Sequence, residues 1–351
     1  MFEALDAKTA AVFSAADVRE NVPLRSYTSF CIGGPCDYFY DMRSIPELQS
    51  VLNVARRVGI EMTTMGKGSN LLVSDRGVRG LVCHIGDAFA NMRLVDASEV
   101  SKLDKIEMAE IPAASTTLAQ AGSPVPRRID DASPKCRYVE AQAGVSLAAL
   151  AEFAAERGLS GLEFARGIPG SFGGGLRMNA GAYGEAMHNI VVASQALLSD
   201  GTVINLVGAE HCFAYRHSRF EAEGLIVLSS IIRLVEADPA DIRAKMRDLQ
   251  QRRRQSQPLE HASAGSVFKR PEGHYASKLI MEAGLKGLRV GGAEVSTKHA
   301  GFIVNPERTA SASDVLALIR KIESIILEKY AVKLELELQL CGDYGEEALG
   351  L

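Results

Sequence analysis

The chain has 351 residues, enough for two or three domains, and 47% of them are hydrophobic while 23% are charged. This composition is typical of a folded globular protein. The formal net charge of −4 gives no general electrostatic attraction to nucleic acid or to an anionic membrane, so we expect neither as a partner. The composition leaves the oligomeric state open and is compatible with a monomer.

Several features indicate a cytoplasmic protein without a metal centre. The first residues mix acidic with short apolar side chains and lack the basic and long apolar regions of a secretory signal. The longest apolar run, residues 225–232, contains two serines and is too short to span a bilayer. The cysteines form no CxxC pair and have no histidines at zinc-ligand spacing, so free thiols are expected at Cys31, Cys36, Cys83, Cys136, Cys212 and Cys341.

Short strands and helices alternate in the predicted structure of the first 86 residues. Residues 36–42 have the composition of a strand. Residues 44–59 predict a helix with Ser44 as its N-cap and one apolar face formed by Leu48, Val51, Leu52 and Ala55. Further strands are predicted at residues 61–66, 70–75 and 80–86.

The character of the sequence changes at residues 96–136, which are rich in Ala, Ser, Pro and charge and have little periodicity. We predict an exposed excursion there, either a hairpin or a long loop. A strand at 137–144 and a helix at 145–159 follow, with Gly158 as the expected helix C-cap. Two strands within 190–207 joined by a turn at Asp200–Gly201, and another at 225–235, complete this region.

After residue 236 the sequence predicts a smaller α+β region. Residues 238–256 form a charged helix with a basic end, and a short helix is predicted from His274 to Ala283. Residues 311–330 have the apolar spacing of an amphipathic helix. Residues 332–340 alternate strictly between charged or polar and apolar side chains, which predicts one continuous closing strand.

Two glycine-rich segments have few large side chains, so a ligand could contact their backbone directly. The sequence GKGSN at 66–70 has neither the spacing of a Walker P-loop nor that of a Rossmann fingerprint. It could wrap a phosphate with N–H groups, or it could be a tight turn between strands. Residues 166–184, RGIPGSFGGGLRMNAGAYG, contain seven glycines flanked by apolar residues, which favours a ligand-binding loop over a flexible surface loop. Together they suggest a ligand with a diphosphate and a flat ring system.

A polar segment at 213–220, FAYRHSRF, combines Tyr215 and Arg216 with a second arginine. A guanidinium beside a phenol suits a carboxylate or an enolate, although a solvated loop at the end of a strand would also have this composition.

Two further segments are candidates for chemistry. The sequence SAGSVFKRP presents Ser266 after a glycine and is followed by Lys269 and Arg270; the alternative is a structural turn with a basic rim. Glu335 and Glu337 fall on one side of the predicted closing strand. That pattern usually marks a solvent-facing side, whereas a buried glutamate there would have a raised pKa and could act as an acid.

Seven segments, taken in order from about residue 20 to 342, resemble the UDP-N-acetylenolpyruvoylglucosamine reductase (MurB) family, in the form with the shorter substrate domain. They are YTSFCIGGPCDYF, GKGSNLLVSDRG, GLEFARGIPGSFGGGLRMNAGAYG, FAYRHSRF, SAGSVFKRP, GLKGLRVGGAEVSTKHAGFIVN and LELELQLCG.

The resemblance implies an α+β protein with the FAD-binding fold of the vanillyl-alcohol-oxidase (PCMH) type. It implies a first FAD-binding subdomain at 1–85, joined by the C-terminal strand at 332–351. A second FAD-binding subdomain is implied at 86–236, with the insertion at 96–136. The substrate-binding domain is implied at 237–331.

The implied activity is NADPH-dependent, FAD-mediated reduction of UDP-N-acetylglucosamine enolpyruvate to UDP-N-acetylmuramate, a step in peptidoglycan precursor synthesis. Ser266 matches the proton donor, Arg216 the arginine that stabilises the substrate carboxylate, and Glu337 the acid on the closing strand. The alternatives are another FAD-dependent oxidoreductase of the same fold, or a non-catalytic flavin- or nucleotide-sugar-binding protein.

The resemblance also implies two sets of binding residues. Those expected to hold FAD, chiefly through main-chain groups, are Gly66, Lys67, Gly68, Ser69, Asn70, Gly167, Ile168, Pro169, Gly170, Ser171, Gly173, Gly174, Asn179, Ala180 and Gly181. Those expected to hold the substrate are Tyr215, Arg254, Lys269 and Arg270. Phe172 and Arg177 are bulkier than the small-residue pattern expected in this stretch.

Overall fold

The computed structural model describes residues 5–103 and 135–345, and the chain divides into two compact units. Unit 1 consists of Met1–Ile85 and Gln250–Leu351, and unit 2 consists of Gly86–Leu249. The excursion predicted at 96–136 lies mostly outside the described residues. At its start the chain forms a helix, α3 (Ala97–Leu103), and at its end the strand β7 (Cys136–Gln142) begins.

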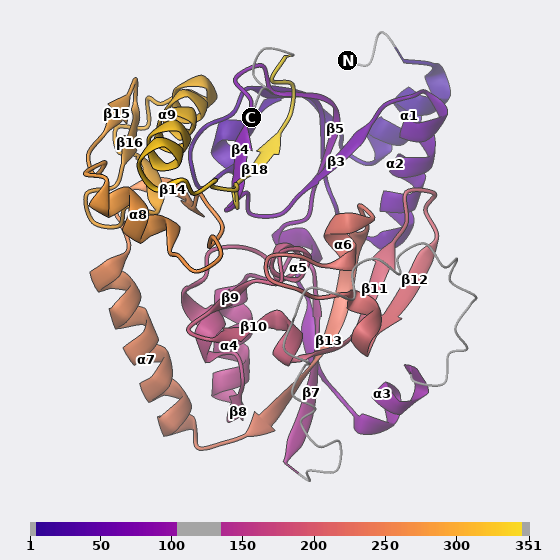
Figure 1. Ribbon diagram of the computed structural model, residues 1–351. Helices are drawn as coiled ribbons and strands as arrows, with labels where there is room; N and C mark the ends of the chain where they lie inside the picture. Colours follow the sequence, from indigo (N-terminus) through magenta and orange to yellow (C-terminus); the bar gives the residue numbers. More distant parts are fainter. Residues whose placement is uncertain (1–4, 104–134, 346–351) are drawn as a thin grey trace. The chain divides into compact units, whose positions relative to one another are not determined.

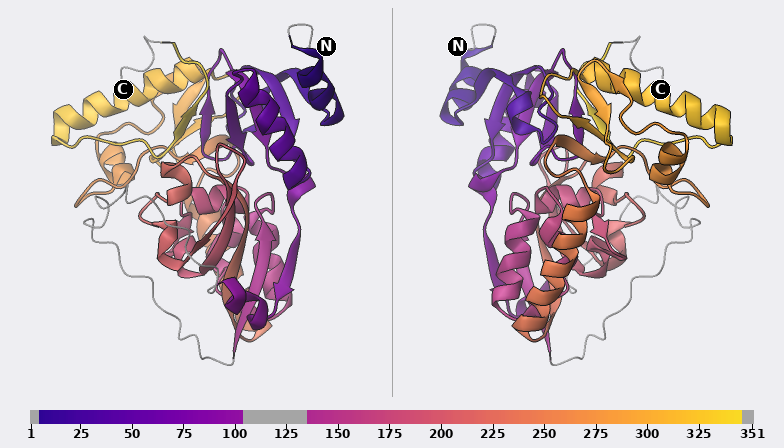
Figure 2. Two further views of the ribbon diagram at one scale, coloured as in Figure 1. Left: turned by 90° about the vertical axis from the view of Figure 1, so that its right-hand side faces the viewer. Right: turned by 90° about the vertical axis from the view of Figure 1, so that its left-hand side faces the viewer.

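The N-terminal part of unit 1 is a sheet covered by two helices. The sheet has the order β1-β2-β5-β3, in which β2 pairs parallel with β5, and β5 with β3. Figure 2 shows the two helices on one side of this sheet. The elements are α1 (Ala7–Ala15), β1 (Arg19–Pro23), β2 (Pro35–Asp41), α2 (Ile45–Arg57), β3 (Met62–Met65), β4 (Leu71–Val73) and β5 (Val78–His84).

The C-terminal part of unit 1 has an antiparallel sheet of its own, in the order β14-β17-β16-β15, with α9 packed against β15 and β16. The last strand, β18, pairs parallel with β4 and so joins the end of the chain to its first part. The elements are β14 (Ala262–Ser266), α8 (Ala276–Glu282), β15 (Arg289–Val290), β16 (Ala293–Val295), β17 (Phe302–Asn305), α9 (Ala312–Tyr330) and β18 (Gln339–Cys341).

Two hydrophobic clusters lie among the described residues of unit 1. One lies in the N-terminal part and includes Leu24, Phe39 and Val82. The other lies around α8, α9 and the C-terminal sheet, and it also takes in Phe30 and Leu72 from the N-terminal part. The burial of residues from both ends of the chain in one cluster explains why the two parts of unit 1 form one compact body.

Unit 2 is built on a sheet in the order β12-β11-β13-β7-β6, with β8 paired to the end of β13 (Figure 1). The short helix α5 packs on β7 and β13, and α4 packs beside it. The elements, besides α3 and β7, are β6 (Met92–Val95), α4 (Leu147–Glu156), β8 (Leu159–Ser160), α5 (Phe172–Arg177), β9 (Gly181–Ala182), β10 (Glu185–Ala186), β11 (Val191–Leu197), β12 (Val203–Val207), α6 (Arg219–Ala222), β13 (Ile226–Glu236) and α7 (Pro239–Ser256), which continues into unit 1.

The amphipathic helices form as the periodicity predicts. In α2 the Ser44 hydroxyl accepts a hydrogen bond from the Glu47 N–H, and the predicted apolar face is buried. In α9 the apolar residues Val315, Ile319 and Ile322, which share one helix face, are buried. After α4, Gly158 takes the left-handed backbone expected of a C-terminal glycine (φ +65°).

The closing segment differs from the prediction of one continuous strand. Only Gln339–Cys341 is a strand, and Leu336 forms an isolated bridge with Phe268. The segment fails to form one strand because its two halves pair with different partners, first residues 267–269 and then β4. In consequence Leu334 and Leu338 are buried while Leu336 and Leu340 are only partly so.

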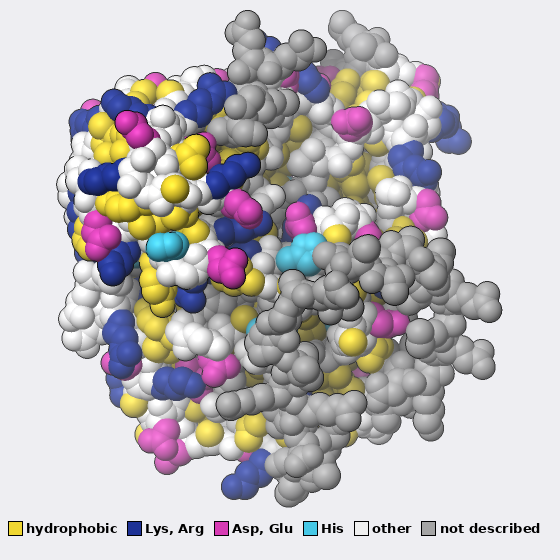
Figure 3. Space-filling model, in the orientation of Figure 1, with side chains coloured by type: hydrophobic (Ala, Val, Ile, Leu, Met, Phe, Trp, Pro, Cys, Tyr) yellow, Lys and Arg dark blue, Asp and Glu magenta, His cyan; other side chains and the backbone are white. Residues whose placement is uncertain are grey.

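One face of the described surface shows mixed charge (Figure 3). On the face drawn in Figure 3, Lys and Arg side chains are interspersed with Asp and Glu side chains. Within residues 5–103 and 135–345, no helix is long and apolar enough to cross a membrane.

Candidate functional site

The GKGSN loop of unit 1 connects β3 to β4 and packs against the chain at Tyr27 and Thr28. Gly68 has a left-handed backbone (φ +55°), and a Cβ there would overlap the Tyr27 carbonyl oxygen. The Ser29 N–H donates to the Gly68 carbonyl oxygen (3.2 Å). Lys67 is exposed, and Gly66, Ser69 and Asn70 are partly exposed. Most of the loop is therefore open to a ligand, while Gly68 serves the packing of the loop itself.

Ser266 and Glu337 lie close together in unit 1. The Glu337 N–H donates to the carbonyl oxygen of Val267, the residue next to Ser266 (2.8 Å). Ser266 ends β14 after a register shift between Ser263 and Ser266, with Gly265 in a left-handed conformation (φ +80°). A bulge of this kind re-aims the side chain that follows it.

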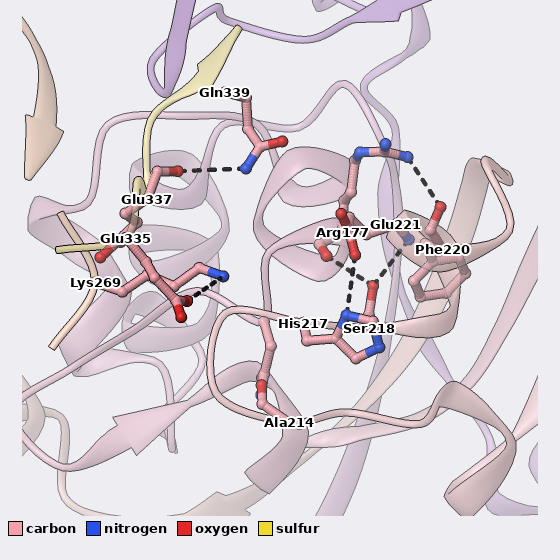
Figure 4. A network of polar contacts seen from close by, with 11 residues as sticks. Arg177, Ala214, His217, Ser218, Phe220, Glu221, Lys269, Glu335, Glu337 and Gln339 are labelled. Atoms are coloured by element: carbon pink, nitrogen blue, oxygen red, sulfur yellow. Dashed lines mark hydrogen bonds and ion pairs between the residues drawn. The ribbon is translucent and has the colours of Figure 1, made fainter. Parts of the chain in front are cut away.

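Asn70 connects the GKGSN loop to the same place. Its side-chain amide donates to the Glu337 carbonyl oxygen (2.9 Å), and its own carbonyl oxygen accepts from the Gln339 N–H (2.9 Å). The Gln339 amide also reaches the Glu337 carbonyl oxygen (3.4 Å, Figure 4). Two amides thus converge on the backbone of Glu337.

The three basic residues predicted for the substrate all lie in unit 1 and differ in their surroundings. Lys269 forms an ion pair with Glu335 (3.8 Å, Figure 4), and both side chains are substantially exposed. The Arg270 guanidinium lies over the ring of Tyr275, 4.6 Å from its centre. Arg254 is exposed near the end of α7, next to the buried Arg253. Cations exposed in this way can bind an anionic ligand without a large desolvation cost.

In unit 2 the glycine-rich stretch is not a loop throughout, because Phe172–Arg177 forms the helix α5. Its glycines let the helix pack closely: a Cβ on Gly173 would lie 2.7 Å from the Ala143 Cβ. The Phe172 and Gly173 N–H groups donate to the carbonyl oxygens of Val145 and Ala143 (2.7 and 2.9 Å). The bulky Phe172 and Leu176 are core residues of unit 2.

The residues predicted to bind FAD in this stretch therefore fall into two groups. Ser171, Gly173 and Asn179 are buried. The exposed or partly exposed ones are Gly167, Ile168, Pro169, Gly170, Gly174, Ala180 and Gly181. The Ser171 hydroxyl accepts from the Gly174 N–H and caps α5. The second group is the part of the stretch that a cofactor could contact directly.

Arg216 sits on a tight turn of unit 2. The Ala214 and His217 backbones exchange hydrogen bonds (3.1 and 3.2 Å) around Tyr215 and Arg216, and Arg216 has a left-handed backbone (φ +54°). Tyr215 is 55% exposed, and the Arg216 guanidinium lies 5.3 Å from its ring centre. A non-glycine residue in this conformation costs about 1–2 kcal/mol, so the surrounding structure must hold it in place.

The glycine-rich stretch holds this turn. The Asn179 side-chain amide donates to the Ala214 carbonyl oxygen (2.8 Å). Two further bonds join residues that follow the turn to Arg177: the Ser218 hydroxyl donates to the Arg177 carbonyl oxygen (2.7 Å), and the Arg177 guanidinium donates to the Phe220 carbonyl oxygen (2.9 Å, Figure 4). Burial lowers the pKa of Arg177. Arg177, which is bulkier than the small-residue pattern expected here, thus helps to hold the segment that follows the Arg216 turn.

The segment leading to the turn is anchored in the core of unit 2 by His211. Its Nδ1–H donates to the Gly208 carbonyl oxygen, and its Nε2 accepts from the Ser194 hydroxyl (both 2.8 Å); Ser194 in turn accepts from Ser230 (2.6 Å). This tautomer follows from the carbonyl partner, which can only accept. Burial lowers the pKa of His211, so the ring is neutral at pH 7.

The structure brings together Ser266, Glu337 and Asn70 in unit 1, and Arg216, Tyr215 and Asn179 in unit 2. Sequence reasoning missed the supporting roles of the Asn70 and Asn179 side chains, of Arg177 and Ser218, and of the His217–Glu221 pair (2.9 Å, Figure 4). For the two asparagines, Arg177 and Ser218 the local sequence contains no signal, since these bonds depend on which segments the fold places together. The His217–Glu221 pair has i,i+4 spacing, which the sequence alone could have indicated.

The chemistry of the two accessible loops fits FAD. Both present glycine backbone and short side chains. Lys67 adds a positive charge to the first loop, and Ile168 and Pro169 add apolar surface to the exposed part of the second. Main-chain N–H groups suit a diphosphate, and a surface without large side chains suits a flat ring. Among the described residues, no cluster of His, Cys, Asp and Glu could hold a metal ion.

Comparison with known protein families gives two matches. Residues 257–341 match the family described as "UDP-N-acetylenolpyruvoylglucosamine reductase, C-terminal domain", and residues 125–207 match the family described as "FAD binding domain". A relative named UDP-N-acetylenolpyruvoylglucosamine reductase from Agathobacter rectalis is 41% identical over 325 residues, covering 93% of this chain and 94% of the relative. One of the same name from Levilactobacillus brevis is 41% identical over 337 residues, covering 96% and 97%.

A solved structure agrees with these relatives. The crystal structure of UDP-N-acetylenolpyruvylglucosamine reductase from Thermus caldophilus matches with a TM-score of 0.70 at 32% identity, covering 92% of this chain and 99% of that one. The expected fold class is confirmed: the chain is an α+β protein with the FAD-binding fold of the vanillyl-alcohol-oxidase type.

Proposed function

Because this chain belongs to the UDP-N-acetylenolpyruvoylglucosamine reductase family, we propose that Ser266, Arg216 and Glu337 carry out the reduction for which the family is named. The chain is an FAD-dependent oxidoreductase that converts UDP-N-acetylglucosamine enolpyruvate to UDP-N-acetylmuramate, with NADPH as the reductant. The product is a peptidoglycan precursor, and a cytoplasmic location is part of the proposal.

The reaction creates charge that the protein must stabilise. The exposed backbone of 66–70 and that of 167–170 are the groups that would contact FAD, and the bound flavin would supply a hydride taken from NADPH. When hydride adds to the terminal carbon of the enolpyruvyl double bond, the electron pair of that bond moves to the adjacent carbon and into the carboxylate. Positive or hydrogen-bonding groups aimed at the carboxylate lower the energy of this dianion.

Arg216 is proposed to pair with the substrate carboxylate. A guanidinium offers two parallel N–H donors to a carboxylate, and the tight turn restricts where the group can go. Glu337, in its protonated form, is proposed to donate a hydrogen bond that stabilises the enol form.

Ser266 is proposed to deliver the proton that completes the reduction. Its Oγ–H bond breaks as a C–H bond forms at the carbon beside the carboxylate, and solvent then returns a proton to the serine. A hydroxyl is a weak acid, but transfer to a strongly basic enolate is favourable. The observation that best supports this assignment is the closeness of Ser266 to Glu337, through the 2.8 Å bond from Glu337 to Val267.

Substrate binding is proposed to involve Tyr215, Arg254, Lys269 and Arg270, the last three as partners for the diphosphate of UDP. The substrate-binding domain is proposed at 237–331, with 1–85 and 86–236 as the FAD-binding subdomains. The antiparallel sheet β14-β17-β16-β15, against which α9 packs, lies within the proposed substrate-binding domain, and its hydrophobic cluster also takes in Phe30 and Leu72 from the first FAD-binding subdomain.

Ser266→Ala tests the proposed proton donor. We expect reduction of the flavin by NADPH at the wild-type rate, and a loss of about 10²–10⁴-fold in its reoxidation by the enolpyruvyl substrate. Both rates are measured by stopped-flow absorbance of the flavin. Ser263→Ala is the matched control, because Ser263 lies on the same strand and uses its backbone carbonyl to accept from Ser29.

Normal turnover of Ser266→Ala would overturn the assignment. A yellow protein that oxidises NADPH but never transfers hydride to the enolpyruvyl substrate would instead indicate a flavin oxidoreductase with another acceptor. A protein that binds flavin or nucleotide sugar without turnover would indicate a binding protein.

A further inference from the structure

We propose that Asn179 and Asn70 are positioning residues: each uses its side-chain amide to hold the backbone that carries a reacting side chain, Arg216 for Asn179 and Glu337 for Asn70. The inference rests on the roles proposed above for Arg216 and Glu337. Asn70 and Asn179 are among the residues predicted to contact FAD. The inference adds a function for their side chains.

The contacts of Asn179 fix its orientation. It is buried (4% exposed) and has a left-handed backbone (φ +44°). Its Oδ1 accepts from the His188 N–H (3.0 Å), so its Nδ2 must point the other way, toward the Ala214 carbonyl oxygen (2.8 Å) and the His188 Nδ1 (3.2 Å). Each of these hydrogen bonds joins the Asn179 side chain to another group of the protein.

The Ala214 carbonyl is the base of the Arg216 turn. Ala214 exchanges hydrogen bonds with His217, and the strained Arg216 lies between them. A buried amide that grips Ala214 therefore fixes one end of the turn. Asn179 also precedes Ala180 and Gly181, which are exposed enough to contact FAD. One residue thus links the cofactor segment to the arginine within unit 2.

Asn70 makes the same kind of link in unit 1. It ends the GKGSN loop, and its Nδ2 donates to the carbonyl oxygen of Glu337 itself (2.9 Å). The Gln339 N–H returns a bond to the Asn70 carbonyl oxygen (2.9 Å), which closes a two-sided clamp on the segment. A displacement of about 1 Å at a reacting group can cost about 10²-fold in rate, so such clamps matter for catalysis.

Asn179→Asp removes the Nδ2 donor. Aspartate has nearly the same size as asparagine, keeps an oxygen that can accept from the His188 N–H, and also tolerates a left-handed backbone. The carboxylate would repel the Ala214 carbonyl oxygen. We expect reoxidation of the flavin by the enolpyruvyl substrate to slow about 10- to 100-fold, with flavin reduction by NADPH, flavin content and flavin spectrum unchanged. Asn189→Asp is the matched control, since Asn189 in the same segment accepts from the Ala186 N–H through Oδ1, which aspartate retains.

A double-mutant cycle separates positioning from general structural support. If Asn179 acts through Arg216, then in an Arg216→Ala background the further effect of Asn179→Asp falls below about 2-fold. A full additional loss in that background would overturn the inference. If the Asn179→Asp protein does not retain flavin, Asn179→Gly takes its place. Glycine adopts the left-handed backbone without strain and also lacks the amide donor, so we expect the same slowing of reoxidation, about 10- to 100-fold.

The parallel test for Asn70 uses Asn70→Asp alone and in a Glu337→Ala background, with Asn53→Asp on the exposed side of α2 as the control. We expect about a 10-fold slower reoxidation that disappears in the double variant. Wild-type reoxidation rates in both asparagine variants would overturn the proposal. If Arg216→Ala and Glu337→Ala themselves reoxidise at the wild-type rate, the proposed function of those residues fails instead.

Discussion

Residues 66–70 in unit 1 and residues 167–181 in unit 2 are both rich in glycine, but their glycines are needed for different reasons. Gly68 has a left-handed backbone, and the atom that a Cβ would overlap is a backbone oxygen, which cannot move aside cheaply. Gly173 has ordinary helical backbone, and the atom that its Cβ would meet most closely is the methyl carbon of Ala143 (2.7 Å), with the Ala143 Cα and carbonyl oxygen further away at 3.3 Å. Gly174, one residue on, is exposed and has only the Ser171 hydroxyl at 3.4 Å.

The comparison shows that glycine content marks where a backbone passes close to something, without saying what that is. In both segments some glycines serve the packing of the protein itself: Gly68 in the first, and Gly173 and Gly181 in the second, where a Cβ on Gly181 would lie 2.5 Å from the Glu185 carbonyl oxygen. More open positions such as Lys67 and Gly174 remain available to a cofactor. What the segments share is the asparagine that follows the glycines and bonds to a functional segment elsewhere in the same unit.

Gly68→Ala should give the largest effect. Left-handed strain and overlap with the Tyr27 backbone together should cost about 2–5 kcal/mol of unfolding free energy. Denaturant unfolding followed by circular dichroism measures it. A loss of unfolding free energy below about 1 kcal/mol would show that the loop can move away from Tyr27. Gly68 would then be no more strictly required than Gly173 of unit 2.

Gly173→Ala should cost less, about 1–3 kcal/mol, because the obstacle is a methyl group. Space can be restored at Ala143, so the double variant Gly173→Ala/Ala143→Gly should recover most of the loss apart from the cost of a new glycine in the chain. No such second-site rescue is expected for Gly68→Ala. Equal losses in the single and double variants would contradict the packing explanation.

The pH dependence of the unfolding free energy tests a third feature, the His211 network of unit 2. Burial lowers the pKa of His211 below its unfolded value of 6.5, so the unfolded chain binds the proton more readily. Stability from this group is full above pH 6.5 and decreases as the pH falls, by at most about 1.4 kcal/mol per pH unit.

The test compares unfolding free energies of the wild type and of His211→Asn between pH 8 and pH 5. Burial also lowers the pKa of His188 and His299, but these groups remain in both proteins, so the difference isolates His211. Parallel pH profiles would show that Ser194 does not require a neutral ring.

Gly174→Ala should give the smallest effect, and of opposite sign. The position is exposed and helical, so alanine should stabilise α5 by up to about 1 kcal/mol. If FAD lies against this backbone, the variant should bind FAD more weakly while the apoprotein melts at the same or a higher temperature. Unchanged FAD affinity, measured by fluorescence titration, would remove Gly174 from the predicted cofactor set.

Local patterns in the sequence predicted the parts of the fold that depend on local physics. The apolar spacing of α2 and α9 and the cap at Ser44 depend on residues within a few positions of each other, and each forms as predicted. The closing strand at 332–340 was predicted wrongly as continuous, because alternation indicates extended backbone and cannot show where the hydrogen-bonding partner changes.

The sequence by itself determined the family, through the order of its motifs, and with it the FAD-binding fold and the identity of the candidate reacting residues. Tertiary structure decided what holds those residues: that Asn70 grips Glu337, that Asn179 grips the turn of Arg216, and that Gly173 gives room to Ala143. Such contacts join positions far apart in the chain. Their geometry follows from the packing of whole elements, so no local pattern of residues encodes them.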